Sequence, residues 1–437
     1  AERPRRAWSP AGSRSHVVRQ RACLGLGPGK VRPNSWAEVD GRVLRENLHL
    51  VRFHLGRARG GRGGEASPRI GAVLKANAYG HGAVLAGRVF ASAHIDALFV
   101  SEVETALELR SAPEVPPSLP IVLLYRAPDR GIVCLLAEAN VTASVLSTDW
   151  VEQATHWPPC SAPLRLHIMV DTGLGREGLL PSEVSGAARA VLRRWPEWSL
   201  DGAYTHWCCP YDVEEMRKSK QAFDASLAVV AELRRELPSG VGDIPFTVHA
   251  SSSSTVLYGA DYDMLRVGGL LLGDPVTLAD PTGYHYTLPG PHRTLLWKSY
   301  VMSLHRPRPG TRWGRCAASA GCLDGPLHHG GMLLGTVPVG GDEFRHTLVM
   351  SAKHREKLPL IEKASSTLVV HIPEETRTYH DADIGVEVLL CEESCIQGLF
   401  NVPAHVPRFL VNDPSIELSD YCPPETIRVE PRQKRKK

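Results

Sequence analysis

The sequence predicts an α/β protein in which a (β/α)8 TIM barrel is followed by a mainly β C-terminal domain. Eight short apolar runs alternate with amphipathic stretches up to about residue 274, and such an array of parallel strands and helices closes most simply as a barrel. Beyond that point helical periodicity fades, and Pro, Gly, His and β-rich stretches dominate. A length of 437 residues also exceeds one ordinary core, so two domains are expected.

The predicted barrel strands are short and nearly continuous in apolar residues, as strands buried on both faces are. They span residues 70–74, 97–100, 121–124, 141–145, 164–170, 199–204, 246–249 and 264–267. Apolar residues at helical spacing predict an opening helix after Trp36, and later helices cover 102–109, 131–139, 182–194 and 218–237. An open, doubly wound sheet is the alternative, but no G-x-G-x-x-G follows the first strand.

Four segments are expected along the chain. Residues 1–33 form a basic, disordered extension, 34–275 the barrel, 276–422 the β-rich domain and 423–437 a basic tail. The first segment holds eight Arg or Lys and one acidic residue, and the last seven residues hold five and none. Basic tails can bind nucleic acid, but solvated ends are the commoner case, so nucleic-acid binding is not expected.

Composition is that of a globular protein, with 43% apolar and 22% charged residues. No apolar run is long enough to span a bilayer, and no secretory signal is visible, so no membrane association is expected. The ten cysteines are scattered without zinc-ligand spacing, which predicts reduced thiols, a cytoplasmic protein and no metal site.

Lys75 is the first residue that suggests chemistry. It ends an apolar strand, and active sites of (β/α)8 barrels lie at the C-terminal ends of the strands. Desolvation there lowers the pKa of an amine and makes it a nucleophile. Taken alone, a lysine at a strand end is more often a surface group.

The segment around this lysine, AVLKANAYGHG at 72–82, resembles the pyridoxal-phosphate (PLP) lysine motif of the alanine racemase family, V-x-K-A-[DN]-A-Y-G-H-G. The resemblance continues in chain order over roughly residues 36–415. It rests on WAEVD at 36–40, SEVETALELR at 101–110, VDTGLGREG at 170–178, GAYTHW at 202–207, HASSS at 249–253, MLRVGGLLLG at 264–273, TVPVG at 336–340 and VPRFLV at 406–411. These enzymes are fold-type III PLP proteins.

The resemblance implies how the cofactor is held. Lys75 carries PLP as a Schiff base, and Tyr79 binds the cofactor phosphate. Ser253 and the backbone amides of Gly268 and Gly269 bind the phosphate as well, where small residues let the backbone approach a dianion closely.

Three further roles follow from the same resemblance. His206 lies beside the pyridine ring, Arg266 faces the pyridine nitrogen, and Arg176 neutralises the substrate carboxylate or supports its neighbours. A cation at the pyridine nitrogen keeps that nitrogen unprotonated, so the ring withdraws electrons less strongly. Related decarboxylases place a carboxylate there, so Arg266 favours proton transfer at Cα.

The substrate half of the site departs from the family pattern. Trp313 stands where the family has its second catalytic base, a tyrosine, and indole cannot accept a proton. Tyr300 or a cysteine such as Cys316 are candidate substitutes. Other replacements are Gly341 for a tyrosine, Met169 at a position often held by a carbamylated lysine, Ile396 or a neighbour for a phosphate-binding tyrosine, and Ser252 for an asparagine.

The sequence therefore predicts a PLP-dependent isomerase of amino-acid metabolism, an alanine racemase or a divergent derivative. The alternatives are a one-base PLP enzyme of the transaminase, aldolase or decarboxylase type, and a non-catalytic PLP-binding protein. By resemblance, the chain is expected to form a homodimer with shared active sites and to bind a small amino acid.

Overall fold

The computed structural model of the protein contains two units. The described residues are 33–58, 69–236, 245–258, 261–274, 276–279, 283, 285–287, 292–307, 332–340, 348–376, 378, 387–391 and 406–413. One unit comprises residues 41–294, and the other joins the residues up to Asp40 with those from Leu295 onwards. The expected basic tails lie outside the described residues, apart from residue 33.

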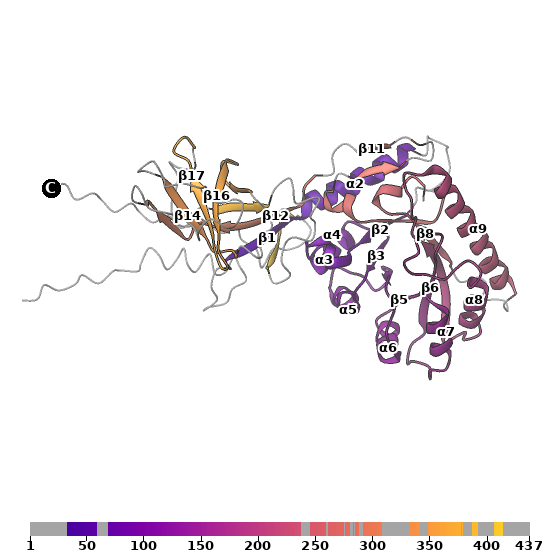
Figure 1. Ribbon diagram of the computed structural model, residues 1–437. Helices are drawn as coiled ribbons and strands as arrows, with labels where there is room; N and C mark the ends of the chain where they lie inside the picture. The colour runs from indigo at the N-terminus through magenta and orange to yellow at the C-terminus, as the bar shows by residue number, and fades with distance from the viewer. Residues whose placement is uncertain are drawn as a thin grey trace, which may run out of the picture. The chain divides into compact units, whose positions relative to one another are not determined.

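The first unit is a closed parallel barrel of eight strands, as predicted (Figure 1). Its strands pair in chain order, and the last strand closes on the first. They are β2 (Arg69–Val73), β3 (Ala97–Val100), β4 (Ile121–Leu123), β5 (Val141–Val145), β6 (Leu164–Val170), β7 (Trp198–Thr205), β8 (Thr247–Ala250) and β9 (Met264–Val267).

Helices follow the strands and cover the barrel. They are α2 (Gly41–Ala58), α3 (Lys75–Tyr79), α4 (Ala83–Ser92), α5 (Val103–Ser111), α6 (Arg130–Glu138), α7 (Thr148–Thr155), α8 (Val184–Leu192), α9 (Val213–Arg235), and the 3-10 turns η1 (Ser253–Thr255) and η2 (Gly269–Leu272). Figure 1 shows α7, α8 and α9 side by side on the outside of the strands. The side chain of Asp212 caps α9 by accepting the N–H groups of Glu214 and Glu215.

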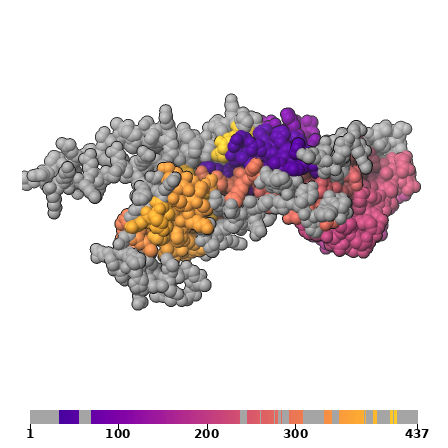
Figure 2. Space-filling view, turned by 90° about the horizontal axis from the view of Figure 1, so that it is seen from above, coloured from indigo at the N-terminus to yellow at the C-terminus, as the bar shows by residue number. Residues whose placement is uncertain are grey.

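The helix α2 shows how sequence pattern becomes packing. Leu44, Leu48 and Val51 lie on one side and are buried, as the helical spacing predicted. Arg42 and Glu46 form an exposed ion pair one turn apart. The atoms of this helix, coloured indigo, are visible at the surface in Figure 2.

Within the described residues, the second unit is a nine-stranded sheet in the order β13-β14-β17-β16-β15-β18-β12-β1-β19. Its strands are β1 (Ser35–Asp40), β12 (Leu295–Tyr300), β13 (Ser303–His305), β14 (Leu333–Val337), β15 (Leu348–Ser351), β16 (Lys357–Lys363), β17 (Leu368–Ile372), β18 (Glu387–Cys391) and β19 (Arg408–Val411). The mainly β character expected after the barrel is confirmed.

The N-terminal strand β1 differs from expectation. Residues 35–40 were assigned to the barrel segment, but they pair antiparallel with β12 and parallel with β19. Trp36 and Val39 are buried, and Glu38 forms an ion pair with Lys298 of β12 at 2.8 Å. The barrel segment predicted as 34–275 thus corresponds to a unit that spans 41–294.

The end of the barrel unit also lies later than residue 275. A short ribbon of β10 (Thr277–Ala279) and β11 (His285–Thr287) follows the last barrel strand. The side chain of Asn47 in α2 donates to the carbonyls of Leu271 and His292 and accepts the N–H of His292. These bonds hold the segment up to Thr294 to the first helix of the barrel unit.

The prediction of reduced thiols is wrong for one pair of cysteines. Cys134 of α6 and Cys160, which follows α7, form a disulfide because these consecutive βα units place the two residues side by side. Cys208 and Cys209 are free. Within the described ranges, every helix is too short or too polar to cross a membrane.

Candidate active site

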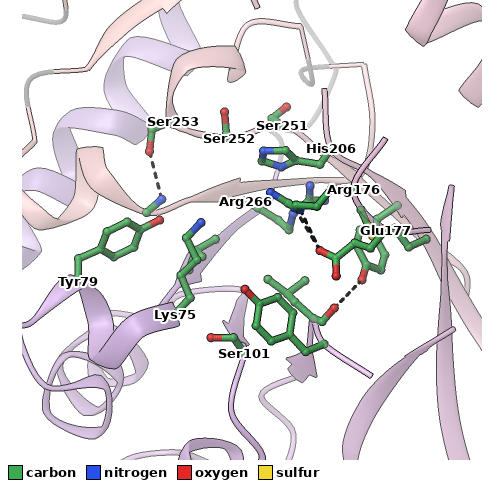
Figure 3. Close-up of a pocket in the computed structure, with 16 residues that line it drawn as sticks. Lys75, Tyr79, Ser101, Arg176, Glu177, His206, Ser251, Ser252, Ser253 and Arg266 are labelled. Carbon is green, nitrogen blue, oxygen red and sulfur yellow. Dashed lines mark hydrogen bonds and ion pairs between the residues drawn. The ribbon is translucent and has the colours of Figure 1, made fainter. Parts of the chain in front are cut away.

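A cavity of about 200 Å³ opens at the C-terminal ends of the barrel strands, where the sequence placed the chemistry (Figure 3). The residues that line it lie at the ends of strands β2, β3, β4, β6, β7, β8 and β9 or in the segments that follow them. Seven of the eight predicted site residues share this cavity: Lys75, Tyr79, Arg176, His206, Ser253, Arg266 and Gly268. The eighth, Gly269, is the buried first residue of η2 and is not part of the lining.

Lys75 directly follows β2 and points into the cavity (Figure 3). The pKa of its amine is lowered, first by burial and then by Arg176, with a smaller lowering by Arg266, while Glu177 raises it. Lowering the pKa increases the fraction of neutral amine, which is the nucleophilic form. The Lys75 amine lies 5.8 Å from the ring centroid of Tyr79.

The loops after β8 and β9 form a cradle of polar groups, in which backbone N–H groups converge on one side-chain oxygen. The N–H groups of Gly268 and Leu270 both donate to the Ser253 hydroxyl, at 3.2 and 3.3 Å. A Cβ atom on Gly268 would lie 2.5 Å from the Tyr79 hydroxyl, so only glycine allows this approach. Burial, and then the charge of Asp274, raise the pKa of Tyr79 to about 12, so its hydroxyl stays a donor.

Ser251 adds an unused donor to the same wall. Its hydroxyl is buried and has no hydrogen-bond partner among the described residues, although the side chain lines the cavity. A buried polar atom without a partner costs about 1–3 kcal/mol. The cavity therefore has donors that a bound polar group can satisfy, which fits a phosphorylated, polar cofactor.

Arg266 lies at the base of the cavity with only 3% of its surface exposed. Its guanidinium donates to the carbonyls of His249 and Thr205, at 2.9 and 2.6 Å, and to Nδ1 of His249 at 3.0 Å. Burial lowers the pKa of Arg266 to about 10, so the side chain stays charged at neutral pH. It also lies over the ring of Tyr204, 5.1 Å from the centroid.

Two histidines extend this contact into the barrel core. Because Nδ1 of His249 accepts from Arg266, its proton is on Nε2, which donates to Nδ1 of His167 at 2.8 Å. Burial lowers the pKa of His167 to about 4 and that of His249 well below its usual value, so both rings are neutral. Sequence reasoning missed His167, although a histidine inside the apolar run of β6 is a visible signal.

Arg176 lies on the loop that follows β6. The Asp171 carboxylate fixes this loop by accepting the N–H groups of Gly173, Leu174 and Gly175. The Arg176 side chain is 55% exposed and forms an ion pair with the neighbouring Glu177 at 3.2 Å. Glu177 also lines the cavity, and sequence reasoning missed it, although it directly follows Arg176 in the segment VDTGLGREG.

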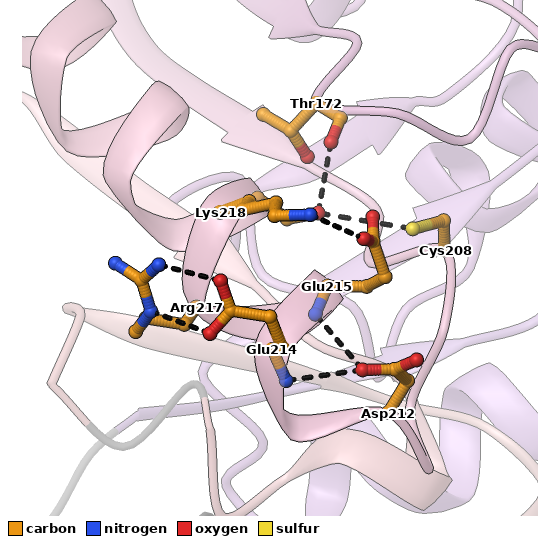
Figure 4. A network of polar contacts seen from close by, with 8 residues as sticks. Thr172, Cys208, Asp212, Glu214, Glu215, Arg217 and Lys218 are labelled. Atoms are coloured by element: carbon orange, nitrogen blue, oxygen red, sulfur yellow. Dashed lines mark hydrogen bonds and ion pairs between the residues drawn. The ribbon is translucent and has the colours of Figure 1, made fainter.

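A polar network joins this loop to the helix α9, as Figure 4 shows, and also to the preceding strand β7. Ser219 of α9 donates to the carbonyl of Thr172 at 2.8 Å, and the hydroxyls of Thr172 and Thr205 lie 2.8 Å apart. The Cys208 thiol lies 3.7 Å from the Ser219 hydroxyl. The loop that carries Arg176 is thereby held against the end of β7.

His206 follows β7 and completes the cavity wall. Burial, followed by the charges of Arg266, Arg176 and Lys75, lowers its pKa to about 3, so the ring is neutral. Of the positions that depart from the family pattern, Met169 and Ser252 line the cavity. Tyr300, a candidate substitute for the missing tyrosine, lies in β12. Trp313, Cys316, Gly341 and Ile396 lie outside the described residues.

Fold and site together define a class: a (β/α)8 barrel, in a chain that also has a β-sheet unit, which presents a lysine amine and converging backbone N–H groups in one cavity. The family model for the N-terminal domain of alanine racemase matches residues 42–275, more than half of the chain. The chain belongs to the alanine racemase family, as the sequence motifs indicated.

Relatives and solved structures agree with this assignment. Alanine racemase of Streptococcus suis is 32% identical over 246 residues, which is 56% of this chain but only 62% of that protein. The Geobacillus stearothermophilus alanine racemase is 27% identical over 310 residues, 70% of this chain and 71% of that one. The match to the first of these relatives thus spans less than two thirds of its length.

The fold resembles that of solved alanine racemases. The Bacillus anthracis enzyme with bound L-Ala-P has a TM-score of 0.68 at 22% identity, and the match covers 88% of this chain and 96% of that one. The Bartonella henselae enzyme, solved with covalently bound pyridoxal phosphate, has a TM-score of 0.62 at 21% identity, with 87% and 100% covered. At these identities the likeness establishes the fold.

Proposed function

We propose that this protein is a PLP-dependent amino-acid racemase that acts at Cα, with alanine as the first substrate to test. The observation that carries the proposal is the shared cavity of the Lys75 amine, the Ser253–Gly268 cradle and the Arg266 guanidinium. Family membership supports the same reaction class. Bound PLP withdraws electrons from the Cα of an attached amino acid and so acidifies the Cα proton.

The residues present fit this cofactor. The N–H groups of Gly268 and Leu270 converge on one oxygen already, and Tyr79 and Ser253 add hydroxyl groups beside them, which suits a phosphate. Lys75 supplies the amine for a covalent link. The hydroxyl of Ser251, without a partner among the described residues, is available to a polar group of the cofactor.

The side chains then divide the remaining work. Because Arg266 can only donate, it would hold the pyridine nitrogen of the cofactor unprotonated, and this would limit the electron withdrawal of the ring to what proton transfer at Cα needs. Arg176 binds the substrate carboxylate by charge. Lys75, with its lowered pKa, gives and takes the Cα proton on its own face of the substrate.

The cofactor link is tested by borohydride reduction of the PLP-reconstituted protein followed by peptide mass spectrometry. We expect the pyridoxyl adduct on Lys75 and none on Lys218, an exposed lysine of α9 that pairs with Glu215. Lys75→Ala should abolish the adduct and its absorbance band, whereas Lys218→Ala should keep both. An unmodified Lys75 in the wild-type protein contradicts the proposal.

The reaction is tested in deuterium oxide with single enantiomers of a panel of amino acids, read by mass spectrometry and chiral chromatography. A racemase incorporates deuterium at Cα and produces the opposite enantiomer. Exchange without inversion would indicate a one-base enzyme, and adduct formation without exchange would indicate a PLP carrier. Either result would overturn the racemase proposal.

A homodimer with shared sites and a cytoplasmic location stay predictions. Sedimentation of the purified chain tests the first. The second is tested by fractionating the source cells.

A further inference from the structure

The topology of the barrel places two chemical groups across its mouth from each other. In a closed barrel of eight strands in chain order, β2 and β6 are separated by three strands in either direction, so they are diametrically opposed. Lys75 follows β2, and the loop with Arg176 and Glu177 follows β6. Figure 3 shows the side chains of Lys75 and Glu177 on opposite sides of the cavity.

The contacts of Glu177 leave one of its oxygens available. Both bonds from Arg176 reach the same oxygen, Oε1, at 3.3 Å from Nε and 3.2 Å from Nη2. Among the described residues, Oε2 has no hydrogen-bond partner, and the side chain is 24% exposed. The negative charge of Glu177 raises the pKa of Lys75, so the two groups lie within electrostatic reach.

The other ionisable side chains of the cavity are less suited to proton transfer. Tyr204 donates its hydroxyl to Ser144 at 2.8 Å, and burial raises its pKa. Tyr79 lies against the Gly268 backbone, and His206 stays neutral far below physiological pH. Tyr125, which is 50% exposed and lines the cavity, is the rival.

We propose that Glu177 is the second proton-transfer group, acting on the face of the substrate Cα opposite Lys75. The proposal rests on the proposed racemase function. In one direction the carboxylate takes the Cα proton, the electron pair stays at Cα and its conjugated neighbours, and the Lys75 ammonium donates a proton to the other face. The reverse reaction exchanges these roles. Arg176 holds the Glu177 carboxylate in place in both directions.

The first test compares Glu177→Gln with the wild type on each enantiomer in deuterium oxide. We expect inversion to fall by about 100-fold or more, the size of a lost general base. Lys75 should still exchange the Cα proton of one enantiomer with retention of configuration. Glu177→Asp should recover part of the inversion, and the control Glu214→Gln, on the surface of α9, should behave as wild type.

A second test needs no cofactor. The acylation rate of Lys75 in the cofactor-free protein, followed by peptide mass spectrometry against pH, reports the pKa of its amine. Removing the charge of Glu177 should move the midpoint of this curve to lower pH, and Glu214→Gln should leave it in place.

Three outcomes overturn the proposal. The first is that Glu177→Gln inverts the substrate as fast as the wild type. The second is that Tyr125→Phe loses inversion but keeps exchange on one face, while Glu177→Gln still inverts. The third is that removing the Glu177 charge leaves the midpoint of the Lys75 acylation curve unmoved. A wild-type protein that exchanges no Cα proton overturns the racemase function as well, so the two failures are distinguishable.

Discussion

Four successive residues after Lys75 adopt a left-handed backbone that side chains disfavour. The φ angles of Ala76, Asn77, Ala78 and Tyr79 lie between 50° and 54°, and none of the four is glycine. This conformation costs about 1–2 kcal/mol per residue outside glycine and asparagine. The turn holds Lys75 and Tyr79 on one side of the cavity, so the strained residues lie at the site itself.

Glycine at the exposed position 76 should therefore stabilise the fold. We expect Ala76→Gly to raise the free energy of unfolding by roughly 0.5–1 kcal/mol, because relief of strain outweighs the added entropy of the unfolded chain. The matched change Ala225→Gly, exposed in the right-handed helix α9, should lower it by about 0.5–1 kcal/mol. Urea unfolding of both variants measures the two changes in the free energy of unfolding. A lower free energy of unfolding for Ala76→Gly would contradict the strain argument.

Sequence reasoning found the residues that lie in continuous motifs and missed those that act through space. Lys75 and Tyr79 belong to one segment, so their roles could be assigned together. Glu177 lies in a different segment, and only the opposed strand ends show that it faces Lys75. The histidine contact behind Arg266 was also hidden, because the bond from His249 to His167 joins strands far apart in the sequence.

At the scale of elements, the turns η1 and η2 meet through the Ser253 hydroxyl and leave room for no side chain at Gly268. We expect Gly268→Ala to weaken PLP binding by about tenfold or more, roughly 1.4 kcal/mol, because the new Cβ displaces the Tyr79 hydroxyl. Gly186→Ala in α8 meets nothing within 4 Å, so it should leave affinity unchanged and stabilise the helix by about 0.8–1 kcal/mol. Absorbance titration with PLP measures the affinity of both variants, and denaturant unfolding measures the stability of Gly186→Ala. Equal PLP affinities of Gly268→Ala and the wild type would contradict the proposed role of the cradle.

The barrel strands were predictable because each is a short apolar run between helical stretches. Strand β1 could not be predicted as a strand of the β-sheet unit. Its five motif residues run directly into α2, and its partners β12 and β19 lie more than 250 residues away. The disulfide was missed for the same reason: cysteine spacing does not reveal that α6 and the end of α7 are neighbours.

At the scale of the whole molecule, buried neutral histidines make the fold sensitive to acid. The pKa of His167 is about 4 in the folded protein, lowered by burial, against about 6.5 in an unfolded chain. As pH falls below 6.5 the unfolded state binds the proton first, so stability is lost progressively down to about pH 4. His206, with a pKa of about 3, acts in the same direction.

We expect His167 alone to cost about 2 kcal/mol of stability between pH 7 and pH 5. Denaturant unfolding at both pH values measures the loss. His167→Gln should reduce the difference between the two values, whatever its effect at pH 7, while the exposed His156→Gln should not. An unchanged difference in His167→Gln would show that this ring is not kept neutral.

Strand β1 is made before the barrel, and its partner β12 is made after it. During synthesis, all of residues 41–294 are therefore made while both edges of strand β1 (Ser35–Asp40) are still unpaired. A chain halted at Thr294 would carry Ser35–Asp40 without its strand partners β12 and β19, and an unpaired strand edge is a template for association with other chains. Because β12 and β19 are synthesised after the barrel, the β-sheet unit is the last part of the chain that can complete its folding.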